Sequence, residues 1–454
     1  MFYCDDCHKP VCNEESIDAV AKLFEKEGSN AWFDRPAADI LPEGFTCPHC
    51  GGKHFTQETD TLDGWFDSGS THVAAMQRDQ GFWPADMYIE GGDQYRGWFQ
   101  SSMLTSIASN GVAPYKQIIT HGWTVDGQGK VMHKSLGNAI SPQDTIKDYG
   151  ADILRLWVSS ADYTQDMRLS KPILKQLSDT YLKVRNTCRY ILGNLDGFDP
   201  DDQVAFADMI ELDQWAVSRC NDLVAECRRC YDNYEFHGVY RAIYNFCVVD
   251  MSNFYLDIIK DRLYVEKPDS VSRRAAQTAI YRILRDMTLV FAPILAFTCE
   301  EIWANLPQSA DHDPEACVFN EMPKGGNSKE TAEFMAKWER IRKVRDDVNK
   351  ALENARNQKT IGKSLEAMVQ LTADGELYDF LKENEEMLAQ VFIVSQVQLH
   401  QQAVAQPTGE MEGLAVAIEK AQGEKCERCW TYSDTVGQDA KHPTLCARCA
   451  AIIG

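Results

Sequence analysis

The sequence lacks any long apolar run. Its longest uncharged and largely apolar stretch, Met287 to Phe297, has only 11 residues and contains Pro293, whereas a membrane-spanning helix needs about 20. No charged segment followed by an apolar one stands at the amino terminus, so a signal peptide is not indicated. Internal repeats are also absent. We therefore expect no membrane partner and a cytoplasmic location.

Positive charge is scarce as well. The 46 Lys and Arg are outnumbered by 68 Asp and Glu, which gives a net charge of −22. Because affinity for phosphate comes largely from Lys and Arg, this balance argues against a nucleic-acid partner. It does not exclude one, since a local basic face can coexist with an acidic remainder. The length of 454 residues suggests about three globular domains.

Cysteine, in contrast, is abundant, with 16 residues. In a large chain without a secretion signal, metal binding is favoured over disulfides. Cys426-x2-Cys429 precedes Cys446-x2-Cys449, with 16 residues between the pairs. Four thiolates at this spacing can close a tetrahedral zinc shell. The alternative, four reduced structural cysteines, is disfavoured because the short polar stretch between the pairs offers little core.

A second set at the amino terminus predicts another zinc site. Cys4-x2-Cys7 precedes Cys47-x2-Cys50, with 39 residues between the pairs, and we expect the stretch 30–45 to fold out between the two halves. The competing ligands there are Cys12, His8 and His49. A third pair, Cys227-x2-Cys230, falls in a predicted helix without a second pair nearby, and we interpret it as two ordinary side chains.

Patterning predicts a multidomain α/β plus α protein. A strand at 86–90, a helix at 94–110, a strand at 115–121 and a helix at 150–160 indicate a parallel sheet. Ligands of such sheets bind at the carboxyl ends of the strands, which are here 90–94 and 122–135. The expected segments are a zinc module (1–59), an α/β segment (60–170), a helical bundle (171–306), a linker (307–332), a helix with a mixed junction (333–420) and a second zinc module (421–454).

The predicted bundle consists of long amphipathic segments. They span 174–195, 212–233, 238–264 and 270–305, the last kinked at Pro293, and a further helix covers 333–358. The aromatic residues Trp215, Phe254, Tyr255 and Trp303 fit core positions better than base-stacking ones. Phosphate contacts are better suited to Lys183, Arg185 and Arg189.

Positive charge concentrates locally between Lys337 and Lys363. This stretch contains nine Lys or Arg and four Asp or Glu, which is compatible with a phosphate-facing stripe. A solvated helix with paired charges explains the same pattern equally well.

The stretch from Gly127 to Asn138 places Lys134 and Ser135 on a glycine-flanked loop after a strand. Such a loop can close over phosphates, and Lys134 would supply positive charge where negative charge develops during displacement at phosphorus. Taken alone, this stretch is equally compatible with a solvated turn.

Four motifs give the loop a context. Within about 90 residues the chain carries Trp65-Phe-Asp-Ser-Gly-Ser70, Glu90-Gly-Gly-Asp-Gln-Tyr-Arg-Gly-Trp98, Met132-His-Lys-Ser-Leu-Gly-Asn138 and Gly150-Ala-Asp-Ile-Leu-Arg155. In this order they resemble the carboxy-terminal half of the Rossmann-like catalytic domain of class I aminoacyl-tRNA synthetases. The resemblance covers nearly the whole chain. It is greatest to the isoleucine enzymes, which the terminal four-cysteine module favours, and next to the valine enzymes.

The resemblance implies an ATP- and Mg²⁺-dependent ligase that joins L-isoleucine to tRNA(Ile) through an adenylate. It implies that Glu90, Gly91, Asp93 and Gln94 hold the aminoacyl-adenylate and that Trp65 walls the amino-acid pocket. The alternative for Glu90 or Asp93 is an ordinary helix N-cap. The bundle resembles the anticodon-binding domain. The terminal zinc module, with Arg428, Trp430 and Arg448, would contact the anticodon end of the tRNA.

The chain departs from the family at the mobile loop. The family pattern Lys-Met-Ser-Lys-Ser aligns with Val131, Met132, His133, Lys134 and Ser135. Lys134 can inherit the phosphate role and Ser135 matches, whereas Val131 cannot act as a cation. Our hypotheses are that His133 replaces a hydroxyl donor and that Lys130 supplies the missing charge.

The other family signature, His-Ile-Gly-His, and the editing domain are absent from these residues. We therefore expect a fragment that is inactive alone, or one chain of a split enzyme with a separate amino-terminal catalytic half. The alternatives are a valine-enzyme fragment, a non-catalytic tRNA-binding zinc protein derived from a synthetase, and a purely structural zinc scaffold.

Overall fold

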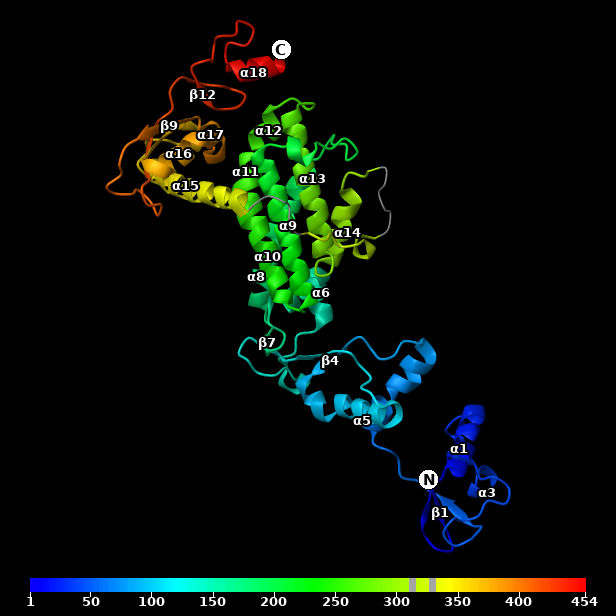
Figure 1. The fold of residues 1–454 in the computed structure, drawn as a ribbon. Coiled ribbons are helices and arrows are strands. Elements are labelled where there is room, and N and C mark those ends of the chain that lie inside the picture. The colour runs from blue at the N-terminus through cyan, green and yellow to red at the C-terminus, as the bar shows by residue number, and fades with distance from the viewer. Residues whose placement is uncertain (310–315, 326–331) are drawn as a thin grey trace. The chain divides into compact units, whose positions relative to one another are not determined.

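The computed structural model describes residues 1–309, 316–325 and 332–454. It consists of two compact units, Met1–His121 and Gly122–Gly454, which are coloured along the chain in Figure 1. Their boundary falls inside the segment 60–170, which we expected to form one α/β domain. In the described residues no helix combines the length and apolar character that crossing a membrane would require.

The first unit opens with a small antiparallel sheet of order β2-β1-β3. Helices inserted between the two cysteine pairs cover it and supply much of its core, which includes Ala37, Ile40, Leu41 and Phe45. The stretch 30–45 therefore does not fold out, because its apolar side chains form the centre of the module. The elements are β1 (Phe2–Cys4), β2 (Pro10–Val11), α1 (Glu14–Glu27), α2 (Ala31–Asp34), α3 (Ala37–Ile40) and β3 (Phe55–Gln57).

The rest of the first unit holds the predicted strand–helix–strand. β4 (Tyr88–Gly91) and β5 (Ile118–His121) are parallel, and they are connected by a 3-10 turn, η2 (Gly92–Arg96), and a helix, α5 (Trp98–Asn110). Gly69 lets α4 (Gly64–Gly69) approach α5 closely, because a Cβ at this position would lie 2.7 Å from the Ser101 hydroxyl oxygen. A π-helical segment, η1 (His72–Gln80), follows α4.

The second unit begins with a short parallel pair, β6 (Thr124–Val125) and β7 (Met167–Arg168). Between these strands lie the predicted loop and two helices, α6 (Pro142–Tyr149) and α7 (Ala151–Ser160). Met132 of the loop packs on an apolar cluster that includes Ile153 and Trp157 of α7. The helix predicted at 150–160 is therefore confirmed, and its apolar face anchors the loop.

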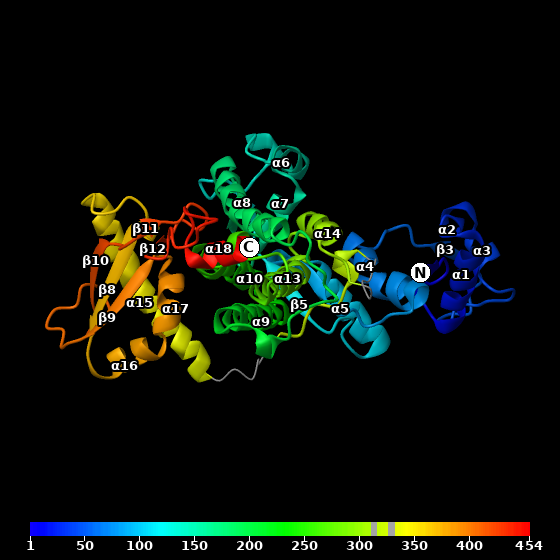
Figure 2. The same cartoon turned by 90° about the horizontal axis from the view of Figure 1, so that it is seen from above.

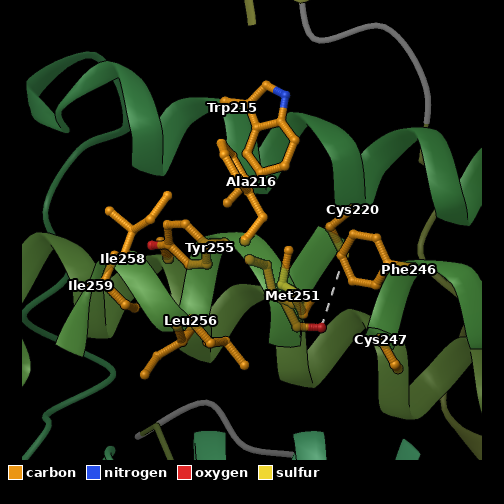
Figure 3. Close-up of a cluster of buried hydrophobic side chains, with 14 of the residues drawn as sticks. Trp215, Ala216, Cys220, Phe246, Cys247, Met251, Tyr255, Leu256, Ile258 and Ile259 are labelled. Atoms are coloured by element: carbon orange, nitrogen blue, oxygen red, sulfur yellow. Dashed lines mark hydrogen bonds between the residues drawn. The ribbon is translucent and has the colours of Figure 1, made fainter. Parts of the chain in front are cut away.

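The bundle follows the predicted helical segments. Its helices are α8 (Lys171–Gly193), α9 (Glu211–Asp232), α10 (Phe236–Asn245), η5 (Phe246–Tyr255), α11 (Leu256–Ile258), α12 (Lys260–Val265), α13 (Val271–Phe291) and α14 (Ala296–Asn305). In Figure 3, Trp215, Ala216 and Cys220 of α9 face Met251 and Tyr255 of η5. Trp215, Phe254, Tyr255 and Trp303 are all buried, which confirms them as core residues.

A buried ion pair ties three parts of the bundle together. Arg262 of α12 donates from both terminal nitrogens to the two carboxylate oxygens of Asp213 on α9, each at 2.7 Å. The Tyr255 hydroxyl donates to the same carboxylate at 2.8 Å. Asp213 is fully buried and Arg262 is 4% exposed. Removing either partner would leave an unpaired buried charge, which typically costs about 3–5 kcal/mol.

A mixed α/β domain follows the bundle (Figure 2). Helix α15 (Ala332–Asn357) leads to a three-stranded sheet of order β10-β8-β9, in which β8 (Ala367–Ala373) is parallel to β9 (Gln396–Gln401) and antiparallel to β10 (Ala415–Lys420). Helices α16 (Gly375–Glu383) and α17 (Glu385–Phe392) pack on this sheet. The stretch 333–420, expected to hold a helix and a mixed junction, thus contains α15 followed by both strands and helices.

The chain ends in the second cysteine module, which contains β11 (Glu424–Lys425), β12 (Tyr432–Ser433) and α18 (Ala447–Ile453). Part of the predicted linker, 310–315 and 326–331, lies outside the described residues. The described part of this linker is not entirely exposed to solvent, since the Cys317 side chain is 1% exposed and belongs to the bundle core.

Candidate active site and metal centres

The cysteines gather into two sets of four. In each set the four Sγ atoms lie within 4.8 Å of one another. Cys12, His8 and His49 belong to neither set, and Cys227 and Cys230 are buried in α9 away from both. The members are those the spacing predicted, namely Cys4, Cys7, Cys47 and Cys50 in the first set and Cys426, Cys429, Cys446 and Cys449 in the second.

The separations between sulfur atoms fit zinc. Zn–S bonds of about 2.3 Å in a tetrahedron place neighbouring sulfur atoms about 3.8 Å apart. Three pairs show this separation, namely Cys4 and Cys50 at 3.6 Å, Cys7 and Cys47 at 3.8 Å, and Cys429 and Cys446 at 3.8 Å. Four thiolates leave no open position, which is the arrangement of structural rather than catalytic zinc. The chain thus carries two structural zinc sites.

Three of the four cysteine pairs form the same tight turn. The residue four positions after the first cysteine adopts a left-handed conformation, with φ of 58° at His8, 77° at Gly51 and 64° at Trp430. Its N–H donates to the carbonyl of that cysteine at 2.8, 2.8 and 2.9 Å, respectively. A left-handed residue other than glycine is uncommon, so His8 and Trp430 are held there by the turn. The fourth pair differs, because Cys446 precedes α18.

In each module, backbone donors favour the ionised form of one cysteine. Burial opposes ionisation of Cys426, but N–H groups of Cys429, Cys446 and Arg428 outweigh it and lower the pKa of the Cys426 thiol to about 6. Burial likewise opposes ionisation of Cys47, and N–H groups of His49 and Cys50 lower its pKa to about 7. Thiolates are the form that binds zinc.

The first unit brings the predicted adenylate-binding residues together. Glu90 and Gly91 end β4, and Asp93 and Gln94 lie on the next turn. Trp65 and Gln94 both lie close to Gly97. A Cβ atom on Gly97 would lie 2.4 Å from the Gln94 side-chain oxygen and 3.4 Å from the Trp65 ring. This group surrounds the carboxyl end of a parallel strand, the usual ligand-binding edge.

The helix-cap alternative for Glu90 and Asp93 is not realised. The Gln94 side-chain oxygen instead accepts the N–H of Trp98 at the start of α5, at 2.9 Å, and its amide donates to Asp93 at 3.1 Å. Glu90, Asp93 and Trp65 remain exposed, which leaves their side chains accessible to a ligand.

The second unit carries the loop, and two residues not singled out from the sequence shape it. The Asp126 carboxylate accepts the N–H groups of Gln128 and Lys130 at 2.9 and 3.0 Å and the Asn138 amide at 2.9 Å. The Asn138 side-chain oxygen in turn accepts the His133 N–H at 3.0 Å. The hydrogen bond from Asn138, with those from the backbone, lowers the pKa of Asp126. The signal in the sequence was Asp126 before two glycines, a common turn pattern.

The predicted ATP-binding side chains line this loop. Lys130, Val131, His133 and Ser135 are exposed. Lys134 begins a short 3-10 turn, η3 (Lys134–Leu136), but its side chain lies outside the described part of the structure. Exposure leaves the loop free to approach a ligand, while Met132 and Asn138 fix its base.

Six of the nine Lys and Arg of the stretch 337–363 form ion pairs, two of them through Arg345 and Arg356. Lys337, Arg340, Arg342 and Lys350 contact carboxylates on other elements at 2.5–3.1 Å. The interpretation as a helix with paired charges is therefore favoured over a continuous phosphate-facing stripe. Of the three bundle cations, Lys183 donates to the Tyr244 hydroxyl at 3.0 Å and Arg185 lies 3.9 Å from Glu301.

Comparisons with known proteins show which families the chain resembles. Residues 1–170 match the family model for class I tRNA synthetases (I, L, M and V), 213–371 match the anticodon-binding domain of tRNA ligases, and 423–452 match the zinc finger found in FPG and IleRS. The described fold is similar to that of the LeuRS from Agrobacterium radiobacter in a ternary complex with tRNA and LeuAMS. That match has a TM-score of 0.50 and 15% identity, over 73% of this chain and 37% of the other.

Curated relatives are similar along the whole chain. An isoleucine–tRNA ligase from Syntrophotalea carbinolica is 50% identical over 457 aligned residues, and those from Caldanaerobacter subterraneus and Moorella thermoacetica are 49% identical. Each alignment covers 100% of this chain and 49% of the relative, so the chain spans about half the length of the proteins it matches. Residues 1–170 therefore carry part of a class I tRNA synthetase domain of the isoleucine, leucine, methionine and valine group, and the chain as a whole is similar to isoleucine–tRNA ligases.

Proposed function

We propose that the chain is the carboxy-terminal part of an isoleucine–tRNA ligase, which uses ATP to join L-isoleucine to tRNA(Ile) through isoleucyl-adenylate. The observation that carries the proposal is about 50% identity with isoleucine–tRNA ligases along the entire chain. Since the chain spans about half of those relatives, the activity belongs to the complete protein. The other half is either part of the same polypeptide or a separate partner chain.

In this proposal the turn after β4 holds the adenylate. Glu90 and Asp93 accept hydrogen bonds from ribose hydroxyls and from the substrate ammonium. Gly91 allows close approach of the backbone, Gln94 orients the turn, and Trp65 forms one wall of the amino-acid pocket. The support is their clustering at the carboxyl end of a parallel strand.

The loop 126–138 then acts on the phosphates of ATP, which binds with Mg²⁺. Lys134 supplies fixed positive charge to oxygens that become more negative at the transition state, and Ser135 donates a hydrogen bond. His133 and Lys130 replace the hydroxyl and the cation that the family loop carries at other positions. Asp126 and Asn138 hold the loop in shape through the hydrogen bonds at its base.

The bundle and the terminal zinc module bind the tRNA. Trp430 is 56% exposed, and the ammonium groups of Lys363 and Lys425 lie 5.6 and 5.7 Å from its ring centre. Arg428 has one buried guanidinium nitrogen without a partner in the described residues. An exposed aromatic ring flanked by cations suits stacking on a base beside a phosphate. A tRNA ligase works where translation occurs, so we place the protein in the cytoplasm.

Binding of tRNA by the chain alone tests the nucleic-acid part of the proposal. We expect tighter filter binding of tRNA(Ile) than of tRNA(Val), weakening between 50 and 200 mM salt as phosphate contacts require. Trp430→Ala should weaken binding about five- to a hundredfold, the range for loss of one stacked base. Phe319→Ala, at another exposed aromatic residue, is the matched control. Equal binding of both tRNAs by wild type and Trp430→Ala would contradict the proposal.

Aminoacylation tests the catalytic part. The complete protein should charge tRNA(Ile) with isoleucine, and Lys134→Ala should slow this reaction by about a hundredfold or more, as expected for lost transition-state charge. Preferential charging of tRNA(Val) with valine would instead assign the chain to a valine enzyme. Specific tRNA binding without charging by the complete protein would indicate a non-catalytic tRNA-binding protein.

A further inference from the structure

The bundle contains a helix break at which several backbone groups are satisfied by side chains from another element rather than locally. Helix α13 ends at Phe291 and α14 starts at Ala296, with Pro293 between them. Proline cannot continue the helical hydrogen bonding, and the N-cap residue of α14, Leu295, has no side-chain acceptor. The break therefore leaves backbone carbonyls on one side and N–H groups on the other that need partners.

The partners come from α7, more than a hundred residues earlier in the chain. Arg155 donates to the carbonyl oxygens of Ile294 and Pro293 at 2.9 and 2.5 Å. Asp152 accepts the N–H of Phe297 at 3.3 Å and both the N–H and the hydroxyl of Thr298 at 2.8 and 2.6 Å. Five hydrogen bonds thus close the break from outside the bundle.

The charges of these two side chains match the groups they contact. Asp152 and Arg155 are three positions apart, so they lie on the same face of α7. The carboxylate meets the positive N-terminal end of α14, and the guanidinium meets exposed carbonyls. Asp152 is only 7% exposed, so its charge is screened little by solvent and depends on these partners.

Helix α7 also holds the loop. It lies between α6 and α14 (Figure 2), and its Ile153 and Trp157 pack in the cluster that contains Met132. Arg155 and Asp152 therefore project toward the bundle from a helix whose apolar side chains carry the loop. No other charged side chain on α7 is available for this contact, since its described residues contain only these two charged groups.

We propose that Asp152 and Arg155 are positioning residues that fix the orientation of the loop 126–138 relative to the helical bundle. The proposal rests on the proposed function, in which the bundle holds the tRNA and the loop acts on ATP. The pair would thereby fix where tRNA held by the bundle lies relative to the loop. A displacement of about 1 Å at a reacting centre can cost about a hundredfold in rate, so loosening this contact should slow transfer to tRNA.

The test separates the two half-reactions of the complete ligase. Asp152→Asn and Arg155→Lys keep the shape or the charge of the side chain but lose the paired hydrogen bonds. We expect isoleucine-dependent ATP–pyrophosphate exchange, which needs no tRNA, to stay within twofold of wild type. The kcat of aminoacylation should fall at least tenfold, while the KM for tRNA changes less than threefold. Asp148→Asn, at an exposed carboxylate of α6, should change neither reaction.

Hydrogen exchange in the 454-residue chain checks the geometry independently. The amides of Phe297 and Thr298 should exchange faster in Asp152→Asn, while α9 and α13 keep their protection. Unchanged aminoacylation kcat in both variants would overturn the proposal. An equal loss of pyrophosphate exchange, or a rise in KM alone, would also overturn it, because the pair would then support the loop or the tRNA site itself. Wild-type ligase without isoleucine-dependent exchange would overturn the proposed function, an outcome visible before any variant is made.

Discussion

The two zinc modules present the same four thiolates on different supports. In the first module the cysteine pairs are 39 residues apart, and the intervening helices form a core around the metal site. In the second only 16 residues intervene. Its apolar contacts include Val265 of α12. Arg448 also makes a bidentate ion pair with Asp261 of the same helix, at 2.7 and 2.8 Å.

Exposure of the ligands follows the same division. All four cysteines of the second module are at most 7% exposed, whereas in the first Cys50 is exposed and Cys7 is half-buried. A short connection between the pairs cannot build a core, so the second module uses a helix of the bundle. We infer that the first module folds around its own insert, while the second depends on the bundle for its position.

The largest expected effect is loss of metal. Cys449→Ser and Cys50→Ser should each reduce zinc from two to one per chain by elemental analysis, because a three-thiolate site binds zinc far more weakly and the metal contributes directly to folding. In wild type, transfer to a chromogenic chelator should show two phases, with the faster one absent in Cys50→Ser. Cys12→Ser, outside both sets, should retain both metals. Two metals in Cys449→Ser would refute the ligand assignment.

The next largest effect should follow from breaking the buried ion pair between Asp213 and Arg262. Arg262 lies on α12, the helix that the second module contacts. Asp213→Asn leaves Arg262 unpaired and should destabilise the bundle by about 3–5 kcal/mol. Denaturation followed by hydrogen exchange should show α12 and the second module unfolding at lower urea, with β1–β3 unchanged. Asp222→Asn, on the exposed side of α9, is the control. Earlier unfolding of both modules would show that the first also depends on the bundle.

A smaller effect should depend on pH. Burial raises the pKa of Asp286 on α13 to about 6, and Arg285 and Arg282 offset this only in part. Folding raises the pKa of this carboxyl above its value in the unfolded chain. Its contribution to the stability of the fold is therefore fully present at low pH and is lost as the pH rises through 6. Asp286→Asn should therefore stabilise the bundle at pH 8, by about 1–2 kcal/mol. Calorimetry at pH 8 and pH 5 should show the advantage shrinking at the lower pH, and a constant advantage would contradict this account.

The smallest effect should come from the ion pair between Arg448 of the second module and Asp261 of α12. Arg448 and Asp261 are 45% and 32% exposed, so solvent screens their interaction and we expect a coupling energy of about 0.5–1 kcal/mol. A double-mutant cycle with Arg448→Gln and Asp261→Asn, read out by protection of α18, would measure it. Zinc content should stay at two per chain. Coupling near zero would leave Val265 and its apolar neighbours as the main docking contact.

The sequence predicted the metal sites well because ligand spacing is a local property. It also predicted the parallel strands β4 and β5 and an interruption at Pro293, since each depends on a short pattern of alternation or on one residue. The interruption was expected as a kink in one helix and is a break between α13 and α14. The prediction that the stretch 30–45 folds out from the module was wrong. Its apolar residues are scattered in the sequence and become buried only when they pack against the sheet that β1 and β3 form.

Features that join distant segments could not be predicted. The role of Asp126 in holding Lys130 and Asn138 requires the loop to be closed. Likewise, the sequence left a phosphate-facing stripe and paired charges equally possible for the stretch 337–363. The choice depends on Glu211, Asp250 and Glu376, which lie on other elements. Arg155 and the carbonyls it satisfies are separated by about 140 residues, and no local pattern connects them.

The most direct test of the central claim is isoleucine-dependent ATP–pyrophosphate exchange, with valine as the control amino acid. It would be measured for the purified 454-residue chain alone and combined with the other half of the ligase. The account predicts no exchange by the chain alone and exchange with isoleucine in preference to valine by the combination. Exchange by the chain alone would mean that these residues contain a complete adenylate-forming site. Absence of exchange in the combination would contradict the assignment as an isoleucine–tRNA ligase.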